Sequence, residues 1–265
     1  MRFLGVLDKM PTLYINPVRY SVKLGNDVAE LNDLIGKSVT LRFTRNIYCT
    51  VCGRKTSKSF GEGMCYPCFA NAPDNSECII RPELCEAHLG KGRDPEWEHR
   101  NHHQPHYVYL ALTNAVKVGV TRGTQLPTRW IDQGAHKGIV IAETPYRQLA
   151  GFIEVFLKDH FSDKTNWQKM LKNEKGEEVD LVKEKERTIA LLPEQFRQYA
   201  YADNEIVEII YPVLEYPVKV SSLSFDKIDV VEGVLQGIRG QYLIFDGGRV
   251  LNIRKHSGYE IELLA

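Results

Sequence analysis

Alternating hydrophobic and polar residues predict β-strands at the beginning of the chain. Residues 20–24 and 39–43 place apolar side chains at every second position, the period of a strand with one buried face. Turn-forming residues occupy 25–27 and 35–37. We therefore expect residues 1–48 to form an N-terminal β segment.

The middle of the chain predicts a hairpin followed by helices. Residues 107–112 and 116–120 read as two strands around a turn at 113–115. A short helix is expected around 127–133, and a longer one over 145–160, where apolar residues fall at helical spacing. A further helical stretch over 180–199 is expected to break near Pro193.

From residue 204 the pattern returns to short strands separated by turns. Asp246-Gly247-Gly248 is a strong hairpin-turn signal. The expected strands are 207–211, 218–220, 233–238, 242–245, 250–254 and 260–264. Because both ends of the chain are rich in strands, we expect them to pack together into one sheet or small barrel.

These patterns divide the chain into four segments and predict an α+β fold. The first is the β segment at 1–48, and the second is a metal-binding region at 49–106, which is rich in Cys, His, Gly and Pro and poor in periodicity. A small α/β module at 107–175 follows, and residues 176–265 form a helix and a C-terminal β segment. A region without hydrophobic periodicity packs no core alone, so metal is the expected agent of its folding.

Composition places the chain among soluble globular proteins. Its 265 residues are 43% hydrophobic and 26% charged. A run of about 18 apolar residues, the minimum for a membrane-spanning helix, is missing. Asp8 follows the N-terminus too closely for a signal peptide. We expect a cytoplasmic protein with no membrane partner, in which six cysteines serve as metal ligands rather than disulfides.

The net charge of zero conceals an uneven distribution of charge. Residues 42–71 contain five basic residues and one acid, and residues 100–175 contain eleven basic and six acidic residues. Residues 176–210 reverse the balance, with nine acids and four bases. A basic middle favours a surface that faces a polyanion, DNA or RNA. Scattered, solvated charges are the alternative interpretation.

Two Cys-x-x-Cys pairs predict a structural zinc ion. The spacing of Cys49, Cys52, Cys65 and Cys68 is that of a four-thiolate zinc ribbon, in which each pair forms a tight turn that aims two sulfur atoms at one ion. Four protein ligands close the coordination shell, so the ion is expected to be structural rather than catalytic. The alternative is four unrelated buried cysteines.

A second metal site is predicted in the same region. Cys78, Cys85 and His88 are followed by several histidines, and two thiolates with two imidazoles complete a tetrahedron. The chosen ligands are Cys78, Cys85, His88 and His102. The alternative is a pair of buried free cysteines beside a solvated histidine cluster.

Four polar residues after this region occur in an order that resembles a nuclease module. Tyr109 lies in the strand 107–112, Lys117 precedes Val118-Gly119, Arg129 lies on a helix, and Glu154 lies on a later helix. Over residues 107–171 this order resembles the GIY-YIG nuclease module. The resemblance implies a small three-stranded sheet with flanking helices and a metal-dependent phosphodiesterase. Lys117 stands where that family usually has its second tyrosine.

The resemblance gives each of these residues a role. Tyr109 positions or deprotonates the attacking water, Lys117 neutralises phosphate charge, and Arg129 offers a bidentate fork to phosphate oxygens. Glu154 holds one Mg²⁺. Each also has an ordinary interpretation: a strand aromatic for Tyr109, a solvated face for Lys117, a helix surface charge for Arg129, and an i,i+4 ion pair with Lys158 for Glu154.

The whole chain also resembles an uncharacterised bacterial family, the domain of unknown function numbered 2797. This resemblance supports the fold more than a function. The segments that carry it are KSFG at 58–61, RPELC at 81–85, KVGVTR at 117–122 and PTRWIDQGA at 127–135.

Three functional hypotheses follow from these observations. The first is a nucleic-acid-processing enzyme in which the zinc ribbon grips the substrate and the GIY-YIG-like module cuts it. The second is a DNA- or RNA-binding protein without catalysis, which accounts directly for a lysine at 117. The third is a scaffold that binds protein partners.

Overall fold

The computed structural model describes residues 1–161 and 166–265 as a mixed α+β fold with three sheets. The chain forms two compact units, and neither is continuous in sequence. The first unit comprises Met1–Ala70, Leu171–Asn173 and Ile209–Ala265. The second comprises Asn71–Met170 and Glu174–Glu208. The predicted metal-binding region, 49–106, is therefore divided between the two units.

An eight-stranded sheet forms the centre of the first unit. Seven strands follow the order β1-β15-β5-β12-β13-β14-β11, and β6 pairs with β5. Every pairing is antiparallel except that of β11 with β14. The strands are β1 (Arg2–Val6), β5 (Ser38–Tyr48), β6 (Lys55–Thr56), β11 (Ser221–Leu223), β12 (Val230–Arg239), β13 (Tyr242–Phe245), β14 (Arg249–Asn252) and β15 (Tyr259–Leu264).

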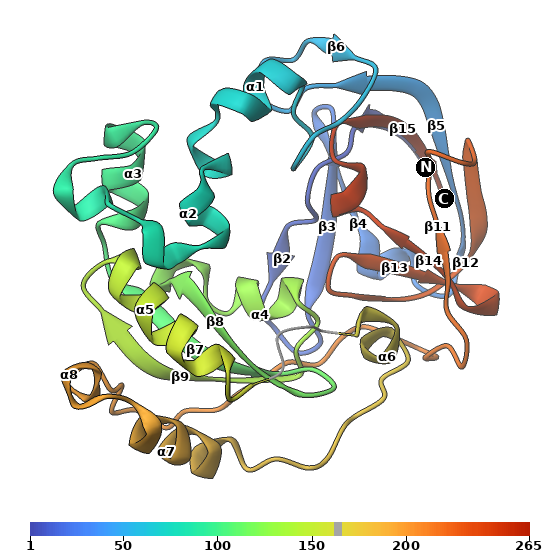
Figure 1. Cartoon of the computed structure of the whole chain (residues 1–265). Helices are drawn as coiled ribbons and strands as arrows, with labels where there is room; N and C mark the ends of the chain where they lie inside the picture. Colours follow the sequence, from blue (N-terminus) through green and yellow to red (C-terminus); the bar gives the residue numbers. More distant parts are fainter. Residues whose placement is uncertain (162–165) are drawn as a thin grey trace. The chain divides into compact units, whose positions relative to one another are not determined.

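The two ends of the chain pair with each other, as their strand patterns predicted. Arg2 of β1 lies opposite Leu264 of β15, and β15 continues the sheet to β5. Figure 1 shows these blue and red strands in the same sheet. A second, three-stranded sheet in this unit has the order β2-β3-β4, with β2 (Thr12–Leu13), β3 (Arg19–Leu24) and β4 (Asp27–Glu30).

A four-stranded antiparallel sheet organises the second unit. Its order is β10-β9-β7-β8, from β7 (His106–Leu112), β8 (Val116–Arg122), β9 (Lys137–Thr144) and β10 (Val207–Glu208). The predicted hairpin is present, and Leu112 of β7 lies opposite Val116 of β8. The strand β9, which no local pattern indicated, occupies the other side of β7.

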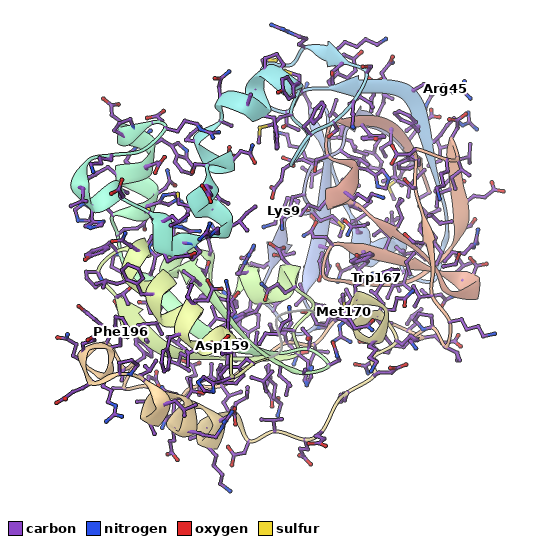
Figure 2. All side chains as sticks on the ribbon, in the orientation of Figure 1. Lys9, Arg45, Asp159, Trp167, Met170 and Phe196 are labelled. Carbon is purple, nitrogen blue, oxygen red and sulfur yellow. The ribbon has the colours of Figure 1, made fainter. Side chains whose placement is uncertain are left out.

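Helices cover the sheet of the second unit and bury its core. Val108 and Leu110 on β7 pack with Ile153 and Leu157 on α5 (Arg147–Lys158). Phe196, labelled in Figure 2, packs against the same core from α8 (Glu194–Arg197). The other α-helices among the described residues are α1 (Tyr66–Asn71), α2 (Glu77–Ile80), α3 (Pro95–His102), α4 (Thr128–Asp132), α6 (Trp167–Leu171) and α7 (Leu181–Leu191).

Several predicted elements are present with shifted bounds. The helical stretch expected over 180–199 is α7 followed by α8, and it breaks at Leu192 and Pro193. The strand expected at 218–220 lies instead at Ser221–Leu223, where it gains a partner in β14. No helix within the described residues has the length and apolar character needed to cross a bilayer.

Candidate metal centres

The first cysteine-rich group brings its four predicted residues together. The sulfur atoms of Cys49, Cys52, Cys65 and Cys68 all lie within 4.8 Å of one another. Cys52 Sγ and Cys65 Sγ are 3.8 Å apart. Cys49 directly follows β5, and Cys65 directly precedes α1, so a strand end and a helix start bring the two pairs together. We call this set the four-cysteine centre.

Tight turns in the backbone position these sulfur atoms. The N–H of Gly53 donates to the carbonyl of Cys49 at 2.9 Å, and the φ of Gly53 is +68°, which glycine adopts without strain. Gly63 has a φ of +93°, and a Cβ there would lie 2.4 Å from the Thr50 side chain. The sequence therefore places glycine where the chain must fold back closely.

The pKa values of two thiols in the four-cysteine centre, Cys49 and Cys68, are shifted in opposite directions. Burial acts to raise the pKa of Cys49, but hydrogen bonds from the backbone around Cys52, Cys65 and Val51 lower it to about 6. The hydrogen bonds that Cys68 makes with the side chains of Cys65 and Cys52 raise its pKa to about 12. Thiolates are the zinc-binding form of cysteine, and a cation between the four sulfur atoms favours that form for all of them.

The second cysteine-rich group lies in the second unit and is fully buried. It consists of Cys78 on α2, Cys85 after the 3₁₀ helix η3 (Pro82–Leu84), and Glu98 and His102 on α3. His102 Nδ1 lies 3.5 Å from Cys85 Sγ and 3.9 Å from Cys78 Sγ. Glu98 Oε2 lies 3.9 Å from Cys78 Sγ and 3.7 Å from His102 Nδ1. We call this set the mixed centre.

The two thiols of the mixed centre also have opposite shifts. The hydrogen bond with Cys85, together with the nearby His102 and Ser76, lowers the pKa of Cys78 to about 4. The same contact with Cys78 raises the pKa of Cys85. In each cysteine-rich group the candidate ligand atoms all lie within 4.8 Å of one another, so each group could hold a zinc ion.

His88, which the sequence predicted as a ligand, is not in the mixed centre. Its ring stacks on Tyr146 with the ring centroids 4.2 Å apart and the planes 8° from parallel. Glu98 occupies the remaining position of the group instead. Glu98 and His102 are four residues apart on a helix whose first turn is capped by Asp94, and this i,i+4 spacing is the signal that would have identified the pair.

Tyr109 is placed in the interior of the second unit. The tyrosine is 1% exposed, its hydroxyl accepts a hydrogen bond from Gln133 Nε2 at 3.1 Å, and its ring meets Trp130 edge-on. Burial raises the pKa of the Tyr109 hydroxyl, although the nearby Arg129 opposes the shift. Lys117 lies on β8 opposite Ala111, two residues from the Gly119 that faces Tyr109.

Glu154 lies on α5 in a mostly buried position. Its carboxylate is 3.7 Å from Lys158 Nζ, which is the i,i+4 ion pair of the ordinary interpretation. Burial raises the pKa of Glu154, and Lys158, Arg147 and Arg129 act against that shift. Glu154 also adds to the raised pKa of Tyr109, so Tyr109, Arg129 and Glu154 interact electrostatically.

The fold and these groups define an α+β protein in which two sets of side chains, one partly exposed and one buried, are suited to metal. The chain belongs to the family described as "Protein of unknown function (DUF2797)", whose model matches residues 36–261. No curated protein and no solved structure matches the chain in the corresponding comparisons.

Proposed function

We propose that this protein binds single-stranded nucleic acid through a zinc ribbon formed by residues 49–70. In this proposal the four-cysteine centre holds one structural zinc ion, which fixes a small surface of basic and aromatic side chains. The zinc contributes folding free energy rather than chemistry, because four thiolates leave no open coordination position.

The observation that carries the proposal is a contiguous cluster of aromatic and basic side chains beside the four-cysteine centre. Lys58 Nζ lies 5.2 Å from the centroid of the Phe60 ring. The Phe60 ring contacts Tyr66 at 5.5 Å and Phe69 at 5.8 Å. Tyr66 is 62% exposed, much more than a core residue. An exposed aromatic ring beside a cation offers a stacking platform for a base next to a contact for its phosphate.

The charge balance of this segment supports a polyanionic partner. Glu62 is the one acid between residues 42 and 71, and it forms an ion pair with Arg254. Arg54, Lys55 and Lys58 are exposed. A neutral protein with a local basic surface binds nucleic acid in a salt-dependent manner, because binding releases counterions from the phosphates.

Fluorescence anisotropy with labelled single-stranded oligonucleotides, DNA and RNA in parallel, tests the proposal. Tyr66→Ala is expected to weaken binding by roughly 5- to 150-fold, from a loss of about 1–3 kcal/mol for one stacked base. Tyr14→Ala is the matched control, because Tyr14 is also an exposed tyrosine of the first unit but lies outside the ribbon. Equal affinity of the Tyr66→Ala variant and wild type, or no binding at low salt, refutes the proposed surface.

A second candidate function is Mg²⁺-dependent cleavage of nucleic acid by the GIY-YIG-like module. The electrostatic interaction of Tyr109, Arg129 and Glu154 favours it. The burial of Tyr109 and the ion pair between Glu154 and Lys158 favour binding without cleavage. A cleavage assay with Mg²⁺ separates the two candidate functions. Cleavage by wild type that is lost in Glu154→Ala supports the enzyme. If wild type cleaves no nucleic acid, binding without cleavage is the function that remains.

A further inference from the structure

We propose that Cys78, Cys85, Glu98 and His102 are the four ligands of a second zinc ion, with Glu98 rather than His88 as the carboxylate ligand that completes the site. This inference goes beyond nucleic-acid binding, because it concerns a metal site in the second unit and holds whether or not the ribbon binds nucleic acid.

The distances in the mixed centre are close to those between ligands that share one ion. Zinc lies about 2.3 Å from sulfur and about 2.0–2.2 Å from nitrogen or oxygen, so neighbouring ligands of a tetrahedral site are roughly 3.3–3.8 Å apart. The four contacts among Cys78, Cys85, Glu98 and His102 measure 3.5–3.9 Å. The 3.7 Å between His102 Nδ1 and Glu98 Oε2 is long for a direct N–H···O hydrogen bond, and all four separations are close to those of atoms that surround a common cation.

The burial of Glu98 requires a compensating positive charge. Glu98 is 2% exposed, and within the described residues its ion-pair partner is His102, which is 3% exposed. A carboxylate removed from water is unfavourable unless a positive charge or hydrogen bonds compensate it, and two sulfur atoms next to Glu98 supply no positive charge. A divalent cation at the centre of the group compensates the carboxylate and the thiolates together.

The loop before α3 is built around the Glu98 carboxylate. The backbone N–H of Arg93 donates to Glu98 Oε1 at 2.8 Å, so the other oxygen, Oε2, is the one that faces Cys78 and His102. Gly92 has a φ of +153°, and a Cβ there would lie 2.3 Å from Glu98 Cδ. Hydrogen bonds that orient the far side of a ligand are characteristic of metal sites.

The mixed centre is also fastened to α5. The guanidinium of Arg147 donates to the carbonyl of Cys78 from Nε and Nη2, both at 3.1 Å, and Nη2 donates to the carbonyl of Ile79 at 2.9 Å. Between the two cysteines, η3 packs on Gly151 so closely that a Cβ there would lie 2.2 Å from the nitrogen of Glu83. A metal at this centre therefore fixes the segment 78–85 against α5.

Zinc analysis of the purified full chain, with competition against a chromogenic zinc chelator, tests the assignment. Wild type is expected to hold two zinc ions per chain. Glu98→Gln keeps the size of the side chain and an oxygen for the Arg93 N–H but removes the anionic ligand. It should therefore lower the affinity for the second zinc ion at least about tenfold. His88→Ala is the matched control and should retain both ions with wild-type affinity.

The first zinc serves as an internal reference for folding. A Glu98→Gln chain that keeps one tightly held zinc and its circular dichroism spectrum has lost the mixed centre alone, which supports the proposal. Substitution with Co²⁺ adds a spectroscopic readout, since the visible ligand-field bands of the second cobalt should shift in Glu98→Gln and stay unchanged in His88→Ala. One zinc per wild-type chain under zinc-replete purification, or loss of the second zinc in His88→Ala but not in Glu98→Gln, overturns the assignment.

Discussion

The four-cysteine centre and the mixed centre assemble their side chains in different ways. The first draws two sulfur atoms from a tight turn after β5 and two from the start of α1, where Cys65 precedes the helix and Cys68 lies in its first turn. The second draws two sulfur atoms, an imidazole and a carboxylate from three short helical elements. The first is thus a local structure that metal can organise, whereas the second depends on where α3 and η3 are packed.

The two centres also differ in how deeply their side chains are buried within their units. The four-cysteine centre contains an exposed side chain, Cys52, and lies beside exposed basic and aromatic residues. All four residues of the mixed centre are buried, and its backbone is held by Arg147 on α5. The comparison indicates that the first centre supports a surface, and that the second supports the interior packing of a unit.

Removal of one thiolate from each centre is expected to have the largest effect. Cys49→Ser should lose the first zinc and unfold the ribbon, because structural zinc binding supplies on the order of 10 kcal/mol of apparent free energy. Cys85→Ser should lose the second zinc and loosen the segment 78–85, while the ribbon keeps its own ion. Zinc content and the thermal unfolding midpoint measure both effects, with Ser57→Ala as an exposed control in the ribbon.

The next largest losses of stability are expected from two glycine substitutions, one near each centre. Gly151→Ala places a methyl group 2.2 Å from the backbone of Glu83, which cannot move aside like a flexible side chain. We expect a loss of about 1–3 kcal/mol in unfolding free energy, from overpacking, and weaker zinc binding at the mixed centre.

Gly53→Ala in the four-cysteine centre is the counterpart of that change. Apart from Gly53 itself and its two chain neighbours, no atom of the described residues lies within 4 Å of the added methyl group, so the cost is limited to the positive φ and should be about 1 kcal/mol. Chemical denaturation measures both variants. A Gly151→Ala chain as stable as wild type would contradict the close packing of η3 on α5.

The sequence was sufficient for the first centre and insufficient for the second. Cys-x-x-Cys spacing specifies a metal turn locally, so all four residues of the first centre were predicted. In the mixed centre Cys78, Cys85 and His102 were predicted, but the fourth ligand was predicted to be His88, from two imidazoles completing a tetrahedron with two thiolates, and Glu98 was not among the predicted ligands. Only the tertiary fold, which places α3 beside Cys78 and Cys85, brings Glu98, and not His88, into contact with the thiols.

For the fold, too, local sequence patterns predicted some elements and missed others. Strands with alternating side chains and the hairpin of β7 and β8 were predicted from local patterns, as was the pairing of the two ends of the chain. The strand β9 was not predicted, although it is buried at Ile139 and Ile141. A short apolar run does not distinguish a strand from a buried helix by periodicity. Residues 137–144 form a strand because they pair with β7 in the four-stranded sheet, and the local sequence does not reveal that pairing.

A buried histidine in the first unit predicts a pH dependence that does not involve metal. His256 is fully buried, its Nδ1 contacts the carbonyl of Asn252 at 2.7 Å, and its Nε2 accepts from the N–H of Phe225 at 3.1 Å. Burial lowers the pKa of His256 below its ordinary value of 6.5. The folded state therefore keeps this imidazole neutral at pH values where the unfolded chain binds a proton.

The sign of this dependence follows from linkage. The contribution of the neutral His256 to the unfolding free energy is fully present above about pH 6.5. It is lost as the pH falls below that value, by no more than about 1.4 kcal/mol per pH unit. His256→Gln should be less stable than wild type at pH 8 but should show a smaller loss between pH 7 and pH 5. Urea denaturation at each pH measures the difference, and identical slopes for the two chains would rule out His256 as the origin.

The smallest effect is expected from a comparison of two tyrosines, one in each unit. Tyr109→Phe removes a buried hydroxyl that accepts a hydrogen bond from the half-buried Gln133 amide, so it should cost about 1 kcal/mol of unfolding free energy. Tyr66→Phe removes an exposed hydroxyl and should change stability by less than about 0.5 kcal/mol. Nucleic-acid affinity should remain near the wild-type value in both, because Tyr109 is buried and phenylalanine at 66 still stacks on a base. If Tyr109→Phe weakened affinity or abolished cleavage while leaving stability unchanged, the Tyr109 hydroxyl would belong to a functional site, and the division between a binding first unit and a packed second unit would fail.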